Sequence, residues 1–304
     1  MRAVRFTEYG GVDVLNVDEA PTPTPGPGQV LVQVRAAGIN PGEAKIRDGL
    51  MHARFPATFP SGQGSDLAGI VAAFGNGATG IAVGEHVIGY TNNRASHADY
   101  VLAEAEHLTP KPDAVSWEVA GGLFVAGATA YAAVRAVAPG PGDTVVVAGA
   151  AGGVGSIAVQ LASLTGAAVV GLASQQNHDW LAAHGVIPVA YGDGVADRIR
   201  HVAPKVDAFI DTYGADYVQL ALELGVSADR IDTIANFGAV ARYGVKAEGS
   251  AAGASAGTLA QLAGLTATGQ LEVPITATFP LNDVRDAYQL LAGGHVRGKI
   301  VLIP

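Results

Sequence analysis

The 304-residue chain contains no cysteine. This absence excludes disulfide bonds, thiolate metal ligands and a cysteine nucleophile. Charged residues make up only 15% of the chain, the net charge is −9, and Lys and Arg form no cluster. We therefore expect no nucleic-acid-binding surface, because phosphate binding depends on concentrated basic charge.

Long apolar runs are also missing. No stretch of about 18 uninterrupted apolar residues occurs, so no membrane span is expected. The N-terminal sequence MRAVRFTEYGG lacks the apolar core of a signal peptide. These features predict a soluble, cytoplasmic protein. A chain of this length can form two domains with buried cores.

Short strands separated by turns are expected over residues 1–115. Residues 29–39 alternate apolar and polar side chains, and residues 66–75 and 85–90 have the composition of further strands. The PTPTPGPG segment (21–28) is typical of a stiff surface loop. The final KIVLIP is also expected to be a strand. Its partner could lie in the first half, which would make the first domain discontinuous.

The pattern changes at Ser116. Residues 116–137 fit one long helix with Ser116 as N-cap. From Thr144 onward, five short β-like segments alternate with helix-like segments. This alternation predicts a parallel, doubly wound sheet, so the expected fold class is α/β.

A glycine-rich turn, AGAAGGVG, follows the first of these strands. It fits the dinucleotide fingerprint G-x-G-x-x-G as Ala150-x-Gly152-x-x-Gly155, with alanine in the first place. Gly152 would let the backbone approach a pyrophosphate, and Gly155 would allow tight packing of helix on strand. The amides of Gly153, Val154 and Gly155 would face the anion. The alternative is a purely structural turn.

The loop after the next strand bears on which dinucleotide binds. An NAD site places Asp or Glu about 20 residues beyond the turn, where it bonds the ribose hydroxyls. This chain has Ser174 and Asn177 there, and Asp179 is expected on the following helix. Uncharged polar side chains can donate to a 2′-phosphate, so we expect NADP(H) with Ser174 and Asn177 as contacts. The alternative is a solvated loop, since the loop has no Lys or Arg.

Two later strands end in further candidate residues. Tyr213 follows the AFIDT segment, and Ala235 lies in TIANFG. Ligands of open α/β sheets bind at the carboxyl ends of the strands. We therefore expect Tyr213 and Ala235 to contact the cofactor.

Six segments, in this order, resemble the medium-chain dehydrogenase/reductase superfamily and, within it, the zinc-independent NADPH:quinone oxidoreductase-like branch. They are MRAVRFTEYGGVDVLNV, VLVQVRAAGINPGEAKIRDG, GSDLAGIV, AGATAYAAV, AGAAGGVGSIAVQLA and HVRGKIVLIP. The resemblance implies a GroES-like β-rich catalytic domain (1–115 and 270–304) and a Rossmann NADP(H)-binding domain (116–269). It also implies nicotinamide binding in the cleft between the domains, and a homodimer.

The resemblance also assigns roles to single residues. Asn40 matches an asparagine placed beside the nicotinamide, and its amide could donate to a substrate oxygen. The alternative is a turn-forming Asn before Pro41. Thr129 resembles a threonine that touches the nicotinamide carboxamide. Lys299 would either reach the cofactor phosphates or cap the domain junction.

Other polar residues give weaker expectations. Lys45 and Arg47 are expected to be solvated, and Tyr131 to pack. Tyr90 and His52 are candidate proton donors without a supporting motif.

The missing cysteines narrow the expected chemistry. Zinc-dependent relatives carry a cysteine in the segment occupied here by GINPGEAK, and the eight histidines show no paired spacing that would substitute. Without a metal Lewis acid, alcohol oxidation loses its usual alkoxide stabilisation. We therefore expect an NADPH-dependent, zinc-independent oxidoreductase acting on a small-molecule quinone or α,β-unsaturated carbonyl. The alternatives are a metal-free NADP-dependent alcohol/aldehyde reductase and a non-catalytic NADPH-binding regulatory protein.

Overall fold

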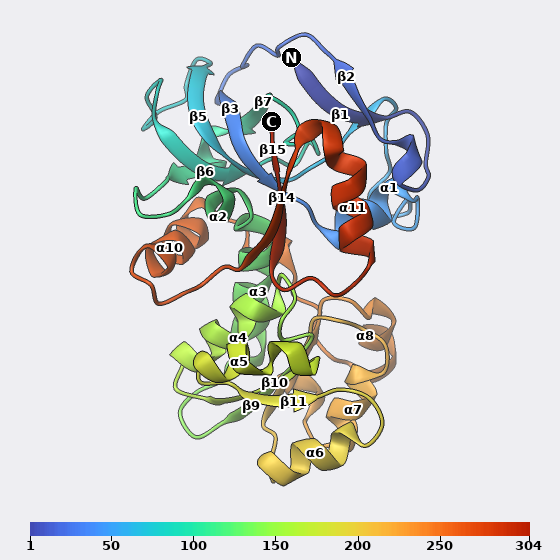
Figure 1. Ribbon diagram of the computed structural model, residues 1–304. Coiled ribbons are helices and arrows are strands. Elements are labelled where there is room, and N and C mark those ends of the chain that lie inside the picture. The colour runs from blue at the N-terminus through green and yellow to red at the C-terminus, as the bar shows by residue number, and fades with distance from the viewer. The chain divides into compact units, whose positions relative to one another are not determined.

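The structure is a computed structural model that describes residues 1–304, and the chain forms two compact units. Unit 1 comprises Met1–Val125 and Ser255–Pro304, and unit 2 comprises Ala126–Ala254. The first and last parts of the chain, blue and red in Figure 1, therefore fold together. Both segments of unit 1 reach further than the expected catalytic domain of 1–115 and 270–304. The functional division into a catalytic and a nucleotide-binding domain stays a prediction.

Unit 1 is built mainly from antiparallel strands. A three-stranded sheet has the order β2-β1-β4, and a larger sheet has the order β14-β15-β3-β5-β6-β8, with β7 also paired to β3. The strands are β1 (Arg2–Phe6), β2 (Asn16–Glu19), β3 (Gln29–Gly38), β4 (Ser61–Gly62), β5 (Asp66–Phe74), β6 (His86–Tyr90), β7 (Tyr100–Glu104), β8 (Leu108–Pro110), β14 (Ile275–Pro280) and β15 (Lys299–Ile303).

The C-terminal strand β15 pairs with β3 from the first half of the chain, as KIVLIP suggested. Its other neighbour is β14. Helix α11 (Val284–Ala292) packs on this part of the unit, where apolar residues from β1, β15 and α11 form one buried cluster. The helices of unit 1 are α1 (Pro41–Arg47), α2 (Trp117–Gly121), α10 (Ala256–Ala267) and α11 (Val284–Ala292), with 3₁₀ turns at Val12–Val14, Ala105–His107 and Leu281–Asp283.

The single helix expected over 116–137 is wrong. The structure has two helices there, α2 and α3 (Phe124–Val137), with the break at Gly122 and Leu123. Ser116 does cap the first one, accepting a hydrogen bond from the Val119 N–H. The glycine pair explains the break, because a Cβ at Gly121 would meet the β3 backbone at Ala36 at 2.5 Å. Close packing on β3 thus takes precedence over helix continuity.

Unit 2 contains the expected parallel sheet. Its strand order is β11-β10-β9-β12-β13, and every neighbouring pair is parallel. The strands are β9 (Thr144–Ala148), β10 (Ala168–Ala173), β11 (Ile187–Ala190), β12 (Ala208–Asp211) and β13 (Ile231–Thr233). The strand order reverses beside β9, which is the switch point at which open α/β sheets bind ligands.

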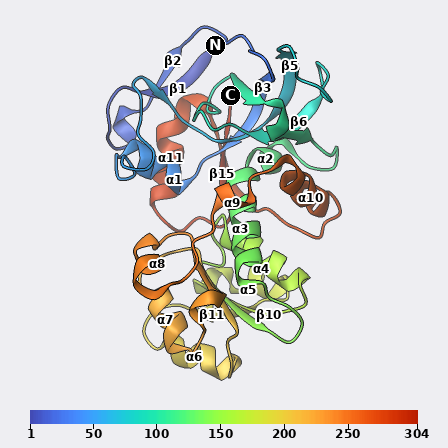
Figure 2. The same cartoon turned by 180° about the vertical axis from the view of Figure 1, so that it is seen from behind.

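Helices cover both faces of this sheet (Figure 1, and Figure 2 from behind). Side chains of α6 (Val195–Val202), α7 (Tyr217–Glu223) and α8 (Phe237–Tyr243) share one buried apolar cluster with the strands. The other helices of unit 2 after the glycine turn are α4 (Gly155–Leu164), α5 (His178–Ala183) and α9 (Ser250–Gly253), with 3₁₀ turns at Gln175–Asn177 and Ala228–Arg230. None of the helices in the chain combines the length and apolar character needed to cross a membrane.

Candidate active site

The glycine-rich turn joins β9 to α4, as its sequence predicts. Gly152, Gly153 and Val154 are partly exposed, and the N–H groups of Gly153 and Val154 donate to no backbone acceptor. A Cβ at Gly155 would collide with the Gly149 carbonyl oxygen, and one at Gly152 would lie 3.3 Å from it. The turn therefore presents bare backbone amides at the start of α4, where a phosphate group is favoured.

The residue that bends this turn is Gly149. Its φ of +70° lies in the left-handed region, where a side chain is strained. Ala150, one residue later, is fully buried, and only a glycine at position 171 leaves room for its Cβ, because a Cβ added at Gly171 would come within 3.0 Å of it. The alanine in the first fingerprint place therefore costs the turn nothing, because Gly149 supplies the conformational freedom.

The loop after β10 brings together the two residues expected at the 2′-phosphate. Ser174 directly follows β10, and the Asn177 Nδ2 donates to its Oγ at 3.0 Å. Both side chains are partly exposed. Asp179 lies in the first turn of α5, as expected. No carboxylate therefore occupies the strand end where an NAD site would carry one.

A buried carboxylate that the sequence pattern did not single out organises the ends of β12 and β13. Asp211 is fully buried, and its Oδ1 accepts the N–H groups of Tyr213 (3.0 Å) and Gly214 (2.7 Å). Its Oδ2 accepts the Thr233 hydroxyl at 2.7 Å, and Thr233 Oγ1 in turn accepts the Ala235 N–H. Burial raises the pKa of Asp211 above its ordinary value. This network shapes both loops in which cofactor contacts are expected.

The expected contacts of unit 2 thus lie at one edge of one sheet. The glycine turn, Ser174, Tyr213 and Ala235 follow β9, β10, β12 and β13 respectively, and the strands are parallel. The Tyr213 side chain is 68% exposed at this edge. Thr129 lies on α3 and is buried. Their roles toward a cofactor stay predictions.

In unit 1, Asn40 sits at the centre of a buried charged network. It is 4% exposed and caps α1, directly after β3. Its Nδ2 donates to Glu43 Oε1 at 3.2 Å and to Asp66 Oδ2 at 3.1 Å, and its Oδ1 accepts from Lys299 Nζ. The amide is therefore held in one orientation, with both N–H groups directed at carboxylates. In this arrangement Asn40 has no free N–H for a substrate oxygen.

Lys299 and Asp66 form a buried ion pair beside Asn40. Their Nζ and Oδ2 atoms lie 3.3 Å apart, and the side chains are 3% and 0% exposed. Lys299 also donates to the Ile39 carbonyl at 3.1 Å, so all three of its N–H groups have acceptors. All three donors are thus occupied within unit 1, and both expected roles of Lys299, at the cofactor phosphates or at the domain junction, stay predictions. The position of Lys299 at the start of β15, far along the chain from Asn40, explains why local pattern gave no sign of the pair.

The network continues from Glu43 to α11. Glu43 Oε2 accepts the Tyr288 hydroxyl at 2.8 Å and the Asn40 N–H at 2.9 Å. Burial, followed by the charge of Glu43, raises the pKa of Tyr288 well above its ordinary value. The expectation of a solvated Arg47 is wrong: it is 3% exposed, donates to the Gly10 carbonyl and lies over the Tyr288 ring at 5.0 Å.

The two candidate proton donors lie in different surroundings. Tyr90 is 5% exposed and stacks between Phe124 (3.9 Å) and His107 (4.1 Å). Burial and the nearby Glu106 raise its pKa, which makes it a poorer acid. His52 is exposed, and its Nδ1 shares a 2.7 Å hydrogen bond with the Tyr9 hydroxyl. The buried position of Tyr90 is therefore explained by its packing between two rings.

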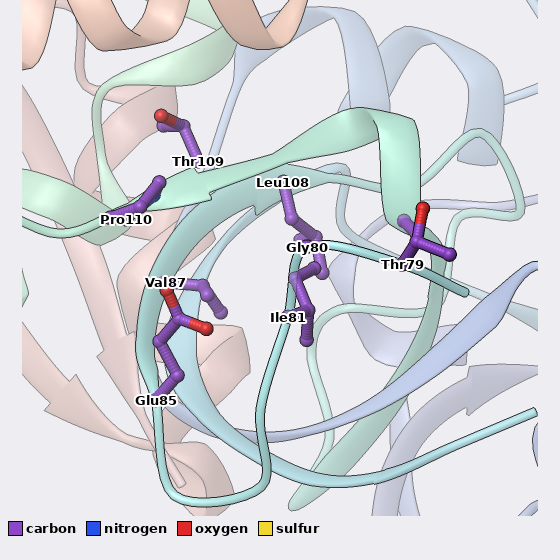
Figure 3. A pocket seen from close by; sticks show the side chains of 9 residues that line it. Thr79, Gly80, Ile81, Glu85, Val87, Leu108, Thr109 and Pro110 are labelled. Carbon is purple, nitrogen blue, oxygen red and sulfur yellow. The ribbon is translucent and has the colours of Figure 1, made fainter.

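Unit 1 also contains a small cavity, shown in Figure 3. Its volume is ≈ 120 Å³, and Ile81, Val87 and Leu108 provide apolar walls. Typical small-molecule sites are larger, about 300–1,000 Å³. Its one carboxylate, Glu85, accepts the Ala82 N–H. We assign no site to this cavity. Nowhere in the structure are three His, Cys, Asp or Glu side chains grouped as they would be to hold a metal ion.

Comparison with known proteins places these features in a family. The family described as "Alcohol dehydrogenase GroES-like domain" matches residues 26–142, and "Zinc-binding dehydrogenase" matches residues 181–302. The solved structure of a quinone oxidoreductase from Coxiella burnetii superposes with a TM-score of 0.91 at 30% identity, covering 100% of this chain and 99% of that one. The chain belongs to the medium-chain dehydrogenase/reductase superfamily.

Within this superfamily the chain is quinone oxidoreductase-like and is an oxidoreductase. Mouse quinone oxidoreductase is 28% identical over 328 residues, which span 100% of this chain and 98% of the relative. The chloroplastic NADPH-dependent alkenal/one oxidoreductase of Arabidopsis thaliana is 29% identical over 325 residues, 100% of this chain and 80% of the relative. The expected combination of a GroES-like domain with a Rossmann domain is confirmed.

This member of the superfamily has site features that sequence reasoning missed. Asp66 lies in the GSDLAGIV segment, which supported the resemblance, but its contact with Asn40 depends on β3 and β5 being neighbours. Tyr191 follows β11 and is 49% exposed. Because Ala173 and Ala190 are register partners, Tyr191 leaves the sheet beside Ser174. The IPVAYG segment could have identified Tyr191, because it is a strand end of the same kind as the one that carries Tyr213.

Proposed function

We propose that this oxidoreductase uses a nicotinamide cofactor, prefers NADPH, and reduces the activated double bond of a quinone or an α,β-unsaturated carbonyl without zinc. The observation that carries the proposal is the carboxyl edge of the unit 2 sheet. There, a turn with bare amides follows β9, and a polar pair without a carboxylate follows β10. Two relatives described above support the substrate class, because their names give quinones and alkenals or alkenones.

The residues present fit the cofactor. The glycine turn has two backbone N–H groups without backbone acceptors at the start of α4, and a Cβ at Gly155 would collide with the Gly149 carbonyl oxygen. Ser174 Oγ accepts from Asn177, so its own hydroxyl hydrogen is free to donate outward. A phosphate oxygen can accept that hydrogen, and no acidic side chain at this strand end repels it. The arrangement therefore favours NADP(H) over NAD(H).

When bound, a reduced nicotinamide supplies a hydride. The chain must then stabilise the oxygen that gains negative charge, and preorganised hydrogen-bond donors do this. We assign this task to Asn40. In this role the Nδ2 hydrogen that is directed at Asp66 Oδ2 would be shared between that oxygen and the substrate oxygen, so the amide keeps its orientation. Asp66 can give up part of this bond, since its Oδ2 also accepts from Lys299 and its Oδ1 accepts the Val125 N–H at 2.6 Å.

Lys299 prepares the Asn40 amide for this task. Its ammonium group donates to Asn40 Oδ1, which polarises the amide and strengthens its N–H groups as donors. The same contact fixes the orientation of the amide, with Oδ1 toward Lys299 and Nδ2 toward the carboxylates. We propose that Lys299 and Asp66 act through Asn40 and touch neither substrate nor cofactor.

The test is a turnover assay on the purified protein. NADPH oxidation is followed by loss of the nicotinamide absorbance, with a quinone, an enone, a saturated ketone and an aldehyde as acceptors. The proposal expects turnover with the quinone or the enone and not with the saturated ketone. It also expects unchanged activity after dialysis against a chelator. Tight NADPH binding with no turnover on any acceptor would contradict it, as would faster oxidation of simple alcohols with NADP⁺.

The homodimer and the cytoplasmic location belong to the same proposal. The resemblance supports a dimer, and the cytoplasmic location follows from the sequence patterns described above. Sedimentation equilibrium of the purified chain tests the first, and fractionation of cells expressing the tagged chain tests the second.

A further inference from the structure

The Glu43 carboxylate accepts four hydrogen bonds and holds the Asn40 amide from the side of α1. Its Oε1 accepts from Asn40 Nδ2 at 3.2 Å and from the Ser65 N–H at 3.1 Å. Its Oε2 accepts the Asn40 N–H at 2.9 Å and the Tyr288 hydroxyl at 2.8 Å. The Glu43 side chain is buried. A carboxylate has about four lone-pair sites, so the acceptor capacity of Glu43 is filled.

All four donors to Glu43 are uncharged, and the neighbouring cations are paired with other acids. Arg47, one turn further along α1, pairs with Asp48 at 3.1 Å, and Lys299 pairs with Asp66. Because no cation neutralises Glu43, its buried charge depends on its hydrogen bonds. Bonds to a charged group are also the stronger kind. Loss of a single donor should therefore disturb the carboxylate.

Tyr288 is the one donor that comes from a distant part of the chain. It lies on α11, 245 residues beyond Glu43. Its side chain is 2% exposed, and the Arg47 guanidinium group lies 5.0 Å from the centre of its ring. Burial raises the pKa of Tyr288 well above its ordinary value, so the hydroxyl keeps its hydrogen as the pH changes. Tyr288 is therefore a permanent donor to Glu43 Oε2.

An ordinary helix start does not require this tyrosine. A Glu at the third helical position often accepts the N–H of the capping residue, and Glu43 does so for Asn40. Here the other carboxylate oxygen also accepts from the Asn40 side chain. The last torsion angle of a Glu side chain is broad, so the carboxylate plane turns readily unless it is held. A fixed donor on Oε2 thus determines where Oε1 meets Asn40 Nδ2.

We propose that Tyr288 is a positioning residue for hydride transfer and acts through Glu43 on the Asn40 amide. The inference rests on the proposed function, in which Asn40 shares one Nδ2 hydrogen with the substrate oxygen. The other Nδ2 hydrogen stays with Glu43, so the direction of the shared hydrogen follows the position of Glu43 Oε1. Tyr288 touches neither substrate nor cofactor in this role.

The test removes the hydroxyl and keeps the ring. Tyr288→Phe does this, and the control Tyr100→Phe removes the hydroxyl of a partly exposed tyrosine on β7 of the same unit. Each substitution is measured alone and together with Asn40→Ala, with NADPH and the enone. We expect Tyr288→Phe to lower kcat about tenfold and to leave the KM for NADPH unchanged. This loss is smaller than the loss of about 10²-fold expected for Asn40→Ala.

The double variant separates positioning from packing. If Tyr288 acts through the amide, Tyr288→Phe should lower kcat by less than about twofold once Asn40→Ala has removed that amide. Tyr100→Phe should leave kcat unchanged with and without Asn40→Ala. An equal fold-loss from Tyr288→Phe in both backgrounds would show that the tyrosine only supports the fold, and it would overturn the proposal. An unchanged kcat in Tyr288→Phe alone would overturn it as well.

Nuclear magnetic resonance separates this inference from the proposed function. In protein labelled with ¹⁵N at asparagine, comparison with Asn40→Ala identifies the side-chain resonances of Asn40. Tyr288→Phe should shift these resonances, and Tyr100→Phe should not. A chain that shows this shift but reduces no quinone or enone would retain the positioning of the amide by Tyr288 and lose the proposed reaction. A chain that reduces the enone, while Tyr288→Phe changes neither the resonances nor kcat, would retain the reaction and lose the inference.

Discussion

Asn177 donates a hydrogen bond from Nδ2 to the Oγ of Ser174 at 3.0 Å, across the 3₁₀ turn that follows β10. This contact occupies an acceptor site of the serine and leaves its hydroxyl hydrogen available. The two side chains that the sequence suggested for the 2′-phosphate therefore act as one unit. Asn177 fixes the position of the Ser174 hydroxyl, and both side chains are partly exposed.

Removing the serine hydroxyl should reduce cofactor discrimination. We expect Ser174→Ala to lower the ratio of kcat/KM for NADPH to that for NADH by about 10-fold or more, since a hydrogen bond to a charged group is worth roughly 1.5–3 kcal/mol. Asn177→Ala should have a smaller effect in the same direction. Steady-state kinetics with both cofactors measures it. An unchanged ratio in Ser174→Ala would remove Ser174 from the 2′-phosphate site.

Asn40 should matter for turnover more than for cofactor binding. Loss of an oxyanion donor typically costs about 10²–10³-fold in kcat, so we expect Asn40→Ala to lower kcat by about 10²-fold. Asn92→Ala, an exposed asparagine in the same unit, should be unaffected. Rate measurements are paired with NADPH titration by fluorescence. If kcat stays at the wild-type value, Asn40 is only the cap of α1.

Removing only one partner of the buried Lys299–Asp66 ion pair should lower the free energy of unfolding. We expect Lys299→Met to destabilise the protein by about 3–5 kcal/mol, because Asp66 is then a buried charge without its partner. The double variant Lys299→Met/Asp66→Asn should regain part of this loss. Arg200→Ala, which breaks an exposed pair, should cost about 0–1 kcal/mol. Urea denaturation compares the variants, and equal costs for Lys299→Met and Arg200→Ala would contradict the assignment.

Asp232 should make stability depend on pH. It is fully buried with one unpaired oxygen, and burial raises its pKa from 3.8 to about 6. The folded state then binds more protons than the unfolded state between these values, so Asp232 stabilises the fold below pH 4 and loses this contribution as pH rises through 6. Two pKa units correspond to about 3 kcal/mol.

The matched variant is Asp232→Asn. Its stability relative to wild type should improve by about 3 kcal/mol between pH 4 and pH 8, because the amide cannot ionise. Asp229, whose pKa is lowered, gives a control of opposite sign in Asp229→Asn. Denaturation at several pH values makes the comparison. A difference between Asp232→Asn and wild type that does not vary with pH would contradict the raised pKa.

Much of unit 2 could be predicted because its signals are local. Each strand from β9 to β13 is a short apolar run, and the glycine turn follows β9 in sequence as in space. Strand ends of a parallel sheet meet at one edge, so Ser174, Tyr213 and Ala235 could be grouped without coordinates. The fingerprint does not predict that Gly149 bends the turn, because it specifies residue types and not backbone angles.

Unit 1 was harder to predict because its site is assembled from distant segments. Asn40 contacts Lys299 because β15 pairs with β3. Arg47 is buried because α11, which carries Tyr288, packs beside α1. A charged side chain in a surface-like sequence gives no local sign that it will be buried with a partner. The break between α2 and α3 has the same origin, in the packing of Gly121 on β3.

The central claim is that hydride reaches an activated double bond with NADPH as the donor. The most direct measurement uses NADPH carrying deuterium at the transferred position, with an enone as acceptor, and locates the label in the product by mass spectrometry and NMR. The account predicts deuterium at the β-carbon of a saturated ketone. Deuterium at the carbonyl carbon of an allylic alcohol would contradict it, as would the absence of both a labelled ketone from the enone and a hydroquinone from a quinone panel.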